Sequence, residues 1–340
     1  MRAVVYRGVD DLRLETLLVP AIRADELLVK VAVCGICPTD IKKIHHGTVR
    51  VGARVRGWRV GDRVALHHHV PCLACHACRH RAFAQCAQYK RTGITAGFEP
   101  AGGGYAEYAR VMSFVLPGVV KIPRGNSFEE GALLEPVNTV LKAVKRLALL
   151  PGDSVLIAGQ GPIGLMFTSL LAARGLRVVA TDLLEPRLKL AKQFGARLIG
   201  RADAVDLAAR VELFVRGRGL DAAIITAPVD AAVLQALEMI RGAGQVLVFA
   251  HTRRGSRTEI DLSKVCVDEK DLLGSYSSDF LLQKEVARIV FSRQIDFARL
   301  ITHRFPLAET STAIRLAARP TPDSLKLVID QRGREAHGQE

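Results

Sequence analysis

The sequence predicts an α/β protein with two parts, a β-rich part and a doubly wound parallel sheet. Two observations predict this fold class. The first 125 residues are rich in glycine and in short β-like runs, whereas from residue 153 onward strand-like runs alternate with apolar helical stretches. A length of 340 residues also suits two domains better than a single core.

The β-like runs of the first part are AVVY, LLVKVAV, RVAL and YAEYARV. They indicate an antiparallel, partly barrel-like domain with long loops. A helix is predicted in NSFEEGALLEP, where Ser127 and Glu130 have the spacing of a capping box. Pro136 interrupts this helical pattern and biases Glu135 away from helical geometry.

Four strand-like runs define the second part, at 154–158, 177–181, 222–226 and 245–249. The helical stretches between them predict βαβ units of a parallel sheet. Segment 155–173 imitates a membrane span, but its Gln160, Pro162 and glycines predict a strand, a turn and a buried helix. DSLKLVID predicts one last strand before a frayed terminus.

Composition and charge suggest where the protein works. The first residues carry charges every few positions and no apolar signal region, so we expect a soluble, cytoplasmic protein. Seven cysteines in a reducing compartment favour metal ligation over disulfides. The net charge is +14, yet the basic residues are spread along the chain, so neither nucleic acid nor a membrane is the expected partner.

A dinucleotide-binding motif follows the first strand of the second part. Gly159, Gly161 and Gly164 form G-x-G-x-x-G between that strand and a helix, an arrangement that lets the backbone approach a pyrophosphate. Asp182 ends the next strand, where a carboxylate accepts hydrogen bonds from ribose hydroxyls and repels a 2′-phosphate, which favours NAD over NADP. Arg187 either stacks beside the adenine or is a plain surface arginine.

A second motif contains four cysteines within a short segment. Cys72, Cys75, Cys78 and Cys86 have the spacing C-x2-C-x2-C-x7-C, which predicts one tetrahedral zinc. Four thiolates leave no vacant position for a substrate, so this zinc would be structural and any chemistry must lie elsewhere.

Two other cysteine features are less specific. Cys34 and Cys37 form a C-x-x-C, but this motif follows a strand in the β-rich part rather than opening a helix in a βαβ unit, which argues against thioredoxin-like redox chemistry. Cys266 has no motif around it, and we expect it to be a buried core thiol.

Several motifs together resemble a known family. GICPTD, the four cysteines, GDRV at 61–64, EPVNT at 135–139, the glycine motif and SLKLVI occur in the same order as in the zinc-dependent medium-chain alcohol dehydrogenases, closest to the threonine and polyol dehydrogenase branch. The resemblance implies a GroES-like catalytic domain at 1–136 and 277–340, with a Rossmann domain at 137–276 inserted into it. It also implies a homo-oligomer, a dimer or a tetramer.

The resemblance assigns roles around a catalytic zinc. Cys37 would be a zinc ligand, Thr39 the hydroxyl that relays the substrate proton, and Asp40 a carboxylate near the metal. Glu135 would lie at or near the same zinc. The alternatives are a turn residue for Thr39 and a surface carboxylate at a helix end for Glu135.

The remaining roles concern the cofactor and the reaction. Thr139 would touch the nicotinamide, and Lys326 would reach the pyrophosphate. The implied activity is hydride transfer from a secondary alcohol, a polyol or an amino alcohol, to NAD. The zinc would lower the pKa of the bound alcohol so that an alkoxide forms near neutral pH.

One family motif is missing. The family has a Gly-His-Glu segment with a zinc-binding histidine between the catalytic cysteine and GDRV, and this sequence has none there. Three explanations are open: the native chain has a block that this sequence lacks, the gene itself lacks it and the site is crippled, or a local histidine substitutes. The candidate substitutes are His45, His46 and the three histidines at 67–69.

The missing segment leaves two further hypotheses beside the dehydrogenase. One is a catalytically silent NAD-binding protein that keeps only its structural zinc. The other is a zinc-ribbon nucleic-acid binder, which predicts an affinity for DNA that falls steeply with salt.

Overall fold

The computed structural model describes residues 1–8, 11–36, 45–67, 69–90, 103–250, 255 and 257–332. The chain divides into two compact units. Unit 1 comprises Met1–Asn138 and Asp279–Glu340, and unit 2 comprises Thr139–Ser278. The domain limits expected from the family resemblance were 136 and 276.

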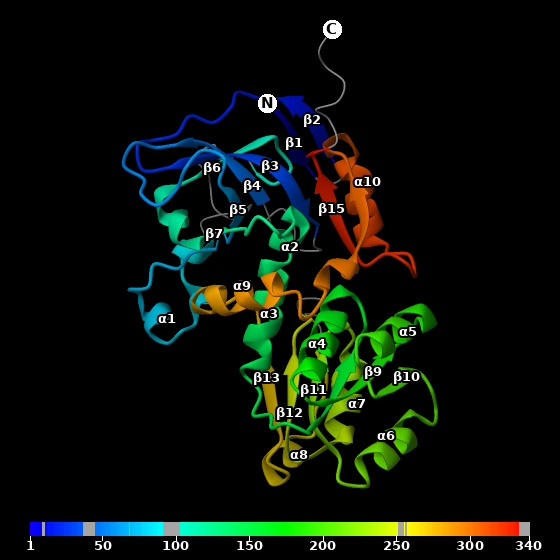
Figure 1. The fold of residues 1–340 in the computed structure, drawn as a ribbon. Coiled ribbons are helices and arrows are strands. Elements are labelled where there is room, and N and C mark those ends of the chain that lie inside the picture. Colours follow the sequence, from blue (N-terminus) through cyan, green and yellow to red (C-terminus); the bar gives the residue numbers. More distant parts are fainter. Residues whose placement is uncertain are drawn as a thin grey trace. The chain divides into compact units, whose positions relative to one another are not determined.

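Unit 2 contains a six-stranded parallel sheet in the order β10-β9-β8-β11-β12-β13 (Figure 1). Its strands are β8 (Ser154–Ala158), β9 (Arg177–Asp182), β10 (Leu198–Arg201), β11 (Leu220–Ile225), β12 (Ile240–Val248) and β13 (Asp271–Gly274). Along the chain, β8, β9 and β10 are added towards one edge of the sheet, and β11, β12 and β13 are added towards the other edge. This is the doubly wound order, and its reversal lies between β8 and β11. The predicted α/β fold class is therefore confirmed.

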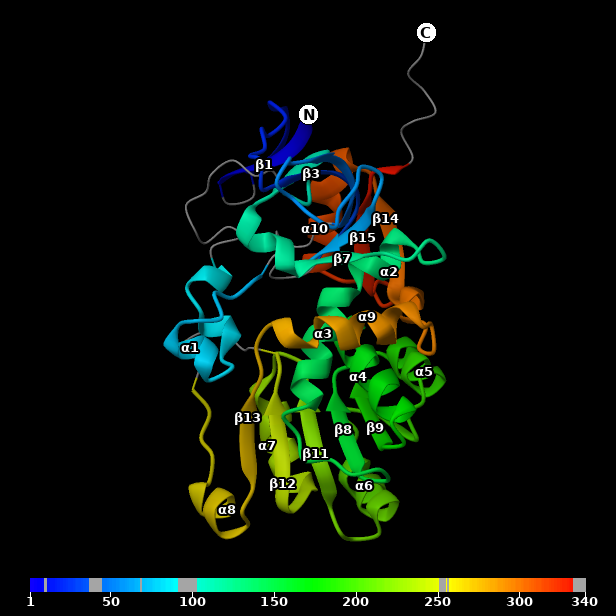
Figure 2. The same cartoon turned by 60° about the vertical axis from the view of Figure 1, so that its left-hand side comes forward.

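The helices of unit 2 pack on this sheet. They are α4 (Pro162–Ala173), α5 (Glu185–Gln193), α6 (Leu207–Val215), α7 (Asp230–Met239) and α8 (Leu262–Val267). In Figure 2, α4 lies beside β8 and β9, which it contacts, while α7 contacts β11 and β12. The segment that imitates a membrane span is thus a buried strand, a turn and a buried helix, as predicted. No helix in the described part of the chain is long and apolar enough to cross a membrane.

Unit 1 is built on a seven-stranded sheet in the order β14-β15-β3-β4-β5-β7, with β6 paired to β3. Its strands are β3 (Leu27–Gly35), β4 (His45–Val51), β5 (Arg63–Leu66), β6 (Tyr108–Val111), β7 (Val119–Lys121), β14 (Ile301–Phe305) and β15 (Lys326–Asp330). A separate hairpin joins β1 (Arg2–Gly8) and β2 (Asp11–Thr16). The pairing is antiparallel except between β14 and β15. The strand that was predicted in the segment DSLKLVID is β15.

The helices of unit 1 are shorter. They are α1 (His76–Arg79), α2 (Phe128–Ala132), α9 (Gln283–Phe291) and α10 (Thr310–Ala318), and α3 (Leu134–Val144) begins here and continues into unit 2. The 3-10 turns are η1 (Phe83–Gln85), η2 (Gln88–Lys90), η3 (Ser113–Gly118), η4 (Phe280–Leu282), η5 (Phe297–Leu300) and η6 (Leu307–Glu309).

The predicted capping box is present at the start of α2. Ser127 Oγ accepts a hydrogen bond from the Glu130 backbone N–H at 3.0 Å, and the Ser127 N–H donates to Glu130 Oε2 at 2.5 Å. The expectation that Glu135 is non-helical is wrong. The helical pattern breaks at Leu133, and Glu135 lies in the first turn of α3. Pro136 is tolerated there because first-turn N–H groups have no intrahelical acceptor.

Two cysteines outside the four-cysteine motif are placed differently from one another. Cys266 is exposed on α8, a helix without a buried residue, so the prediction of a core thiol is wrong. An isolated cysteine carries no sequence signal that separates a core position from the surface face of a short helix. Cys34 is buried in β3 opposite Ile329 of β15, which gives it a packing role.

Glu130 also joins α2 to the segment after α9. Arg293 donates from Nε to Oε1 at 2.6 Å and from Nη2 to Oε2 at 2.9 Å, and Asn126 donates to Oε1 at 3.0 Å. The Arg293 guanidinium, together with the other donors, lowers the pKa of this buried carboxyl to about 2.

We expect Glu130→Gln to lower the free energy of unfolding at neutral pH by about 2 kcal/mol, measured by urea denaturation. Glutamine keeps the acceptor of the capping box but loses the charge that pairs with Arg293. Because the folded pKa lies below the unfolded value, the carboxylate stabilises the fold above pH about 4.5, and this contribution is lost as the pH falls towards 2. The difference between wild type and variant should shrink over the same range.

Glu15→Gln is the control, because it breaks the exposed pair of Glu15 with Arg7 and should change stability little. Equal effects of the two variants would contradict the assignment.

Candidate functional sites: a glycine turn and a four-cysteine centre

The glycine turn lies where the strand order of unit 2 reverses. Gly159 follows β8 with φ +96°, a conformation that favours glycine. A Cβ on Gly164 would lie 1.9 Å from the Gly159 carbonyl oxygen, so only glycine lets α4 approach the turn this closely. A Cβ on Gly161 would meet nothing within 4 Å. The open space in front of Gly161 fits a pyrophosphate.

Helix α4 gives this space a positive potential. Gly161 is its N-cap residue, Pro162 is in its first turn, and that turn contains no acidic residue. The unpaired backbone N–H groups and the dipole at a helix N-terminus favour an anion.

Asp182 at the end of β9 lies beside the turn. It is 8% exposed, and its Oδ2 accepts a hydrogen bond from the Gln160 N–H at 2.6 Å while Oδ1 accepts from the Leu184 N–H at 2.9 Å. Each carboxylate oxygen has a second lone pair, so both can still accept hydrogen bonds from ribose hydroxyls. The arrangement fits the dinucleotide that the motif predicts.

The turn has supports that the motif did not reveal. Thr226, just after β11, donates from Oγ1 to the Gly159 carbonyl at 2.7 Å. The buried Gln160 side chain donates to Ile157 O at 3.0 Å and accepts from Thr168 Oγ1 at 2.9 Å. The one sequence signal for the role of Thr226 is its position at the end of the strand-like run 222–226.

The other predicted cofactor residues lie in three different elements. Arg187 is half-buried on α5, and its Nε has no hydrogen-bond partner among the described residues. Thr139 is buried in α3 of unit 2. Lys326 is buried in β15 of unit 1, where Nζ donates to the Ile36 carbonyl at 2.6 Å.

The four predicted zinc cysteines come together in unit 1. Their sulfur atoms all lie within 4.8 Å of one another. Cys72 Sγ lies 3.9 Å from Cys78 Sγ and 3.7 Å from Cys86 Sγ, and the sulfurs of Cys75 and Cys78 are 3.6 Å apart. Four thiolates at the Zn–S distance of about 2.3 Å in a tetrahedron would be separated by about 3.8 Å. The cluster therefore fits a zinc ion.

The surroundings of the four thiols differ. Backbone N–H groups of Ala74 and Cys75 lower the pKa of Cys72 to about 6, whereas burial raises the pKa of Cys78 to about 12. Zinc binds cysteine as thiolate, so a bound ion would offset the cost of charging the buried Cys78 sulfur.

The predicted catalytic residues are mostly outside the described part. Cys37, Thr39 and Asp40 lie outside it, and Glu135 is half-buried in the first turn of α3. Among the described residues, the four cysteines are the one group of three or more metal-ligating side chains.

The histidines proposed as substitute ligands fall into two places. The backbones of His45 and His46 belong to β4, opposite Val33 and Val31 of β3. His67 and His69 are buried, and the His69 ring stacks on Tyr89 with 4.7 Å between centroids, which is a packing contact. His68 lies outside the described residues.

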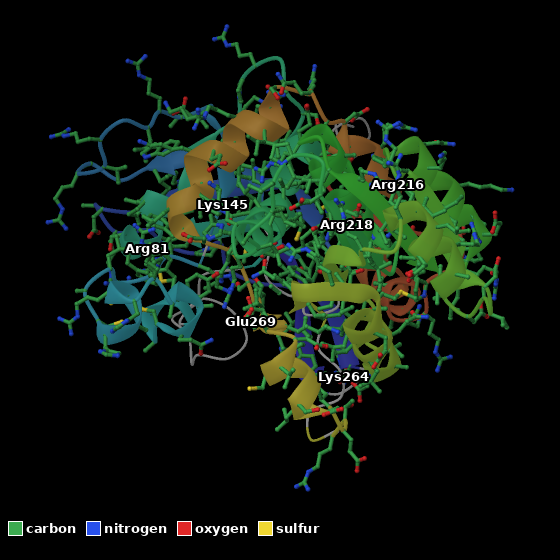
Figure 3. All side chains as sticks on the ribbon, turned by 90° about the horizontal axis from the view of Figure 1, so that it is seen from below. Arg81, Lys145, Arg216, Arg218, Lys264 and Glu269 are labelled. Carbon is green, nitrogen blue, oxygen red and sulfur yellow. The ribbon has the colours of Figure 1, made fainter. Side chains whose placement is uncertain are left out.

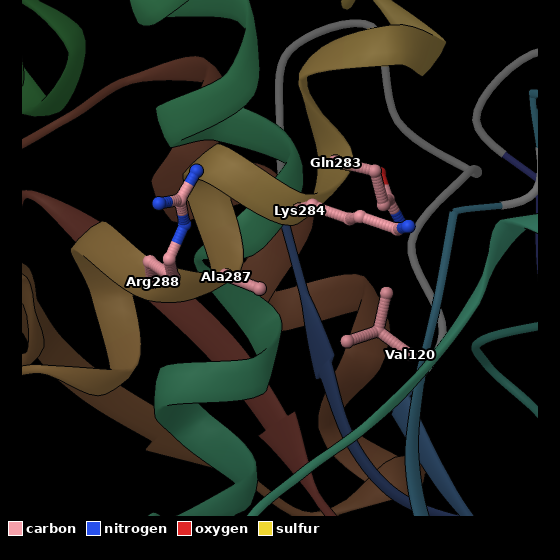
Figure 4. A pocket seen from close by; sticks show the side chains of 5 residues that line it. All are labelled: Val120, Gln283, Lys284, Ala287 and Arg288. Carbon is pink, nitrogen blue, oxygen red and sulfur yellow. The ribbon is translucent and has the colours of Figure 1, made fainter.

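Unit 1 also has an open hollow of about 360 Å³ between β7 and α9 (Figure 4). It is lined by Val120, Gln283, Lys284, Ala287 and Arg288. Lys284 and Arg288 point in different directions from α9, and none of the predicted site residues that the structure describes lines the hollow (Figure 4).

Basic side chains of unit 2 are distributed over several elements. Lys145 follows α3, Arg216 and Arg218 follow α6, and Lys264 belongs to α8 (Figure 3). Lys264 binds Glu238 at 2.7 Å, and Arg218 lies 3.6 Å from Asp221. This arrangement fits a solvated basic surface.

Comparisons with known proteins bear on both sites. The alcohol dehydrogenase GroES-like domain matches residues 23–124, and the zinc-binding dehydrogenase domain matches residues 162–292. Sorbitol dehydrogenase of Bombyx mori is 31% identical over 340 residues, which cover 93% of this chain and 94% of that protein. The chain belongs to the zinc-dependent medium-chain alcohol dehydrogenase family.

Two further relatives agree with this membership. Sorbitol dehydrogenase of Bacillus subtilis is 29% identical over 353 residues, covering 97% of each chain. The structure of alcohol dehydrogenase TADH from Thermus sp. ATN1 superposes with a TM-score of 0.86 at 24% identity, covering 98% of this chain and all of that one, and it shows the shared fold. The predicted family and the oxidoreductase class are thus confirmed, and the four-cysteine cluster fits the predicted structural zinc.

The comparison with Bacillus subtilis also bears on the missing segment. The alignment of 353 residues is longer than the 340 residues of this chain, so residues of the relative stand opposite gaps in this dehydrogenase. Gaps of this kind are what a block missing from this chain would produce.

Proposed function

We propose that this dehydrogenase oxidises a polyol by hydride transfer to NAD. The observation that carries the proposal is the glycine turn with Asp182, in a chain whose relatives are sorbitol dehydrogenases, D-xylulose reductases and an erythritol/L-threitol dehydrogenase. A small alcohol is the substrate class of this family, and amino alcohols are the neighbouring class to test.

Asp182 supports NAD as the cofactor rather than NADP. Its carboxylate lies beside the turn and would repel a 2′-phosphate, while both oxygens keep a lone pair for the ribose. Arg187 is proposed to lie beside the adenine, because its buried Nε has no protein acceptor among the described residues. A related structure from Sinorhizobium meliloti binds NADP, so both cofactors belong in the test.

The catalytic residues proposed are Cys37 and Glu135 at the zinc, Thr39 as the proton relay, and Asp40 near the metal. Zinc bound there would supply a Lewis acid that polarises the alcohol oxygen. Thr139 is proposed to contact the nicotinamide. Lys326 is proposed to contact the pyrophosphate, and its bond to Ile36 O already places the ammonium next to the residue that precedes Cys37.

The test measures zinc content and NAD reduction together. We expect the purified chain to hold a second zinc beside the structural one and to reduce NAD with a member of a panel of sorbitol, xylitol, erythritol, 2,3-butanediol and threonine. Only the structural zinc and no turnover, with NADH still bound, would instead support the silent NAD-binding protein.

A matched variant separates the explanations of the missing segment. It carries a Gly-His-Glu segment of the family's pattern, inserted after Thr48. A second zinc and turnover that appear only in this variant would show that the sequence as it stands has a crippled site, and equal results would point to a substitute ligand.

We also propose that the chain forms a homo-oligomer through the β13 edge of unit 2. β13 is the last strand of the described sheet, and exposed apolar side chains lie on it and on α8, namely Leu272, Leu262 and Val267. A second copy would cover this surface. Sedimentation velocity, which measures the size of the assembly, should then show a dimer or a tetramer rather than a monomer.

The cytoplasm is the proposed location. The six cysteines among the described residues are free thiols, which is the usual state of cysteines in a reducing compartment.

A further inference from the structure

We infer that Thr226 is a positioning residue that fixes the turn for the cofactor pyrophosphate. The inference rests on the proposed function, because it concerns the NAD site of the same unit. It assigns to Thr226, which lies outside the glycine motif, a share of the cofactor affinity.

The peptide group between Gly159 and Gln160 is held at both of its polar atoms. Its carbonyl oxygen accepts the Thr226 hydroxyl at 2.7 Å, and its N–H donates to Asp182 Oδ2 at 2.6 Å. Asp182 ends β9 and Thr226 follows β11, and these strands flank β8 on its two sides. The turn after β8 is therefore clamped from both neighbouring strands.

The hydroxyl proton of Thr226 is directed to Gly159. Thr226 Oγ1 also lies 2.9 Å from the Ala158 carbonyl oxygen. That oxygen already accepts the backbone N–H groups of Thr226 at 2.9 Å and of Ala227 at 3.1 Å. A carbonyl oxygen has two lone pairs, so the shorter bond to Gly159 O is the one that the hydroxyl makes.

The clamp matters because the turn is intrinsically free to rotate. Glycine populates positive and negative φ about equally, so the peptide after Gly159 has no steric preference of its own for the observed orientation. A rotated peptide would change the path by which the backbone enters α4, whose N–H groups face the pyrophosphate. Fixing the peptide beforehand removes an ordering cost from binding.

Thr226 and Asp182 differ in whether the bound cofactor also needs their hydrogen bonds. Asp182 must serve the ribose as well as Gln160, whereas the hydrogen-bond partners of the Thr226 hydroxyl among the described residues are two backbone carbonyls. When the ribose hydroxyls also donate to the Asp182 carboxylate, the Thr226 hydroxyl still bonds to the turn alone.

The test compares Thr226→Val with Thr181→Val in the full chain. The Thr181 hydroxyl is buried at the end of the neighbouring strand β9 and has no hydrogen-bond partner among the described residues. Both changes replace a hydroxyl by a methyl group of nearly equal size. We expect T226V to raise the dissociation constant for NADH about tenfold and T181V to leave it within about twofold.

Further measurements show where the effect acts. ADP-ribose, which has the pyrophosphate but no nicotinamide, should lose affinity for T226V by the same factor as NADH. Thr226→Ser keeps the hydroxyl and should restore wild-type affinity. In turnover, KM for NAD should rise while KM for the alcohol stays constant, a separation that a general loss of stability would not produce.

The outcomes separate the inference from the proposed function. Wild-type protein that does not bind NADH would overturn both. Wild-type binding with an unchanged T226V, or equal losses in T226V and T181V, would overturn the positioning role alone. If T226V does not fold, Thr226→Ala is compared with T226S, and equal affinities of these two would also overturn it.

Discussion

Gly161→Ala should abolish tight NADH binding with little loss of stability. A methyl group at this position would meet no protein atom within 4 Å, and the φ of Gly161 is −66°, which alanine adopts without strain. The added group would instead occupy the space that the pyrophosphate needs. We expect the NADH dissociation constant to rise about 100-fold, measured by isothermal titration, while the free energy of unfolding falls by no more than about 1 kcal/mol, the cost of alanine at an N-cap.

Gly164→Ala provides the contrast within the same motif. Its methyl group would lie 1.9 Å from the Gly159 carbonyl oxygen, so helix α4 must move away from the turn. We expect a loss of about 3 kcal/mol in the free energy of unfolding together with the loss of NADH binding. If Gly161→Ala bound NADH as tightly as the wild type, the space in front of Gly161 would not be the pyrophosphate site.

Cys78→Ser should remove the structural zinc and destabilise the four-cysteine lobe. Cys78 is a buried ligand, and its sulfur lies within 3.9 Å of both the Cys72 and the Cys75 sulfurs. The lobe has only a small apolar cluster of its own, which includes Phe83 and Tyr89. We therefore expect the loss of one zinc per chain in elemental analysis and a fall of several kcal/mol in unfolding free energy.

Cys266→Ser is the matched control, because this thiol is exposed on α8 and lies outside the zinc cluster. It should change neither zinc content nor stability. Zinc that is retained in Cys78→Ser, or lost equally from both variants, would contradict the metal assignment.

Short-range patterns in the sequence predicted much of the local structure. Strands β5 and β8 begin and end where the apolar runs do, and the Ser127–Glu130 capping box forms as expected. Such features depend on residues within a few positions of one another, so the sequence displays them directly. The glycine motif and the four cysteines are local in the same sense.

Contacts between segments that are distant along the chain could not be predicted from the sequence. The partner of Glu130 is Arg293, and the hydroxyl that holds Gly159 belongs to Thr226. The burial of Cys266 and the non-helical geometry of Glu135 were predicted wrongly, because burial and the ends of helices depend on what packs against them.

The sequence by itself determined the family, and it predicted the four zinc cysteines and the dinucleotide turn. Ligand spacing and turn chemistry are set by neighbours along the chain. Only the tertiary structure decided that Asp182 and Thr226 hold one peptide group from two sides. Those contacts exist because a parallel sheet brings the ends of β9 and β11 to β8, although many residues separate the three strands in sequence.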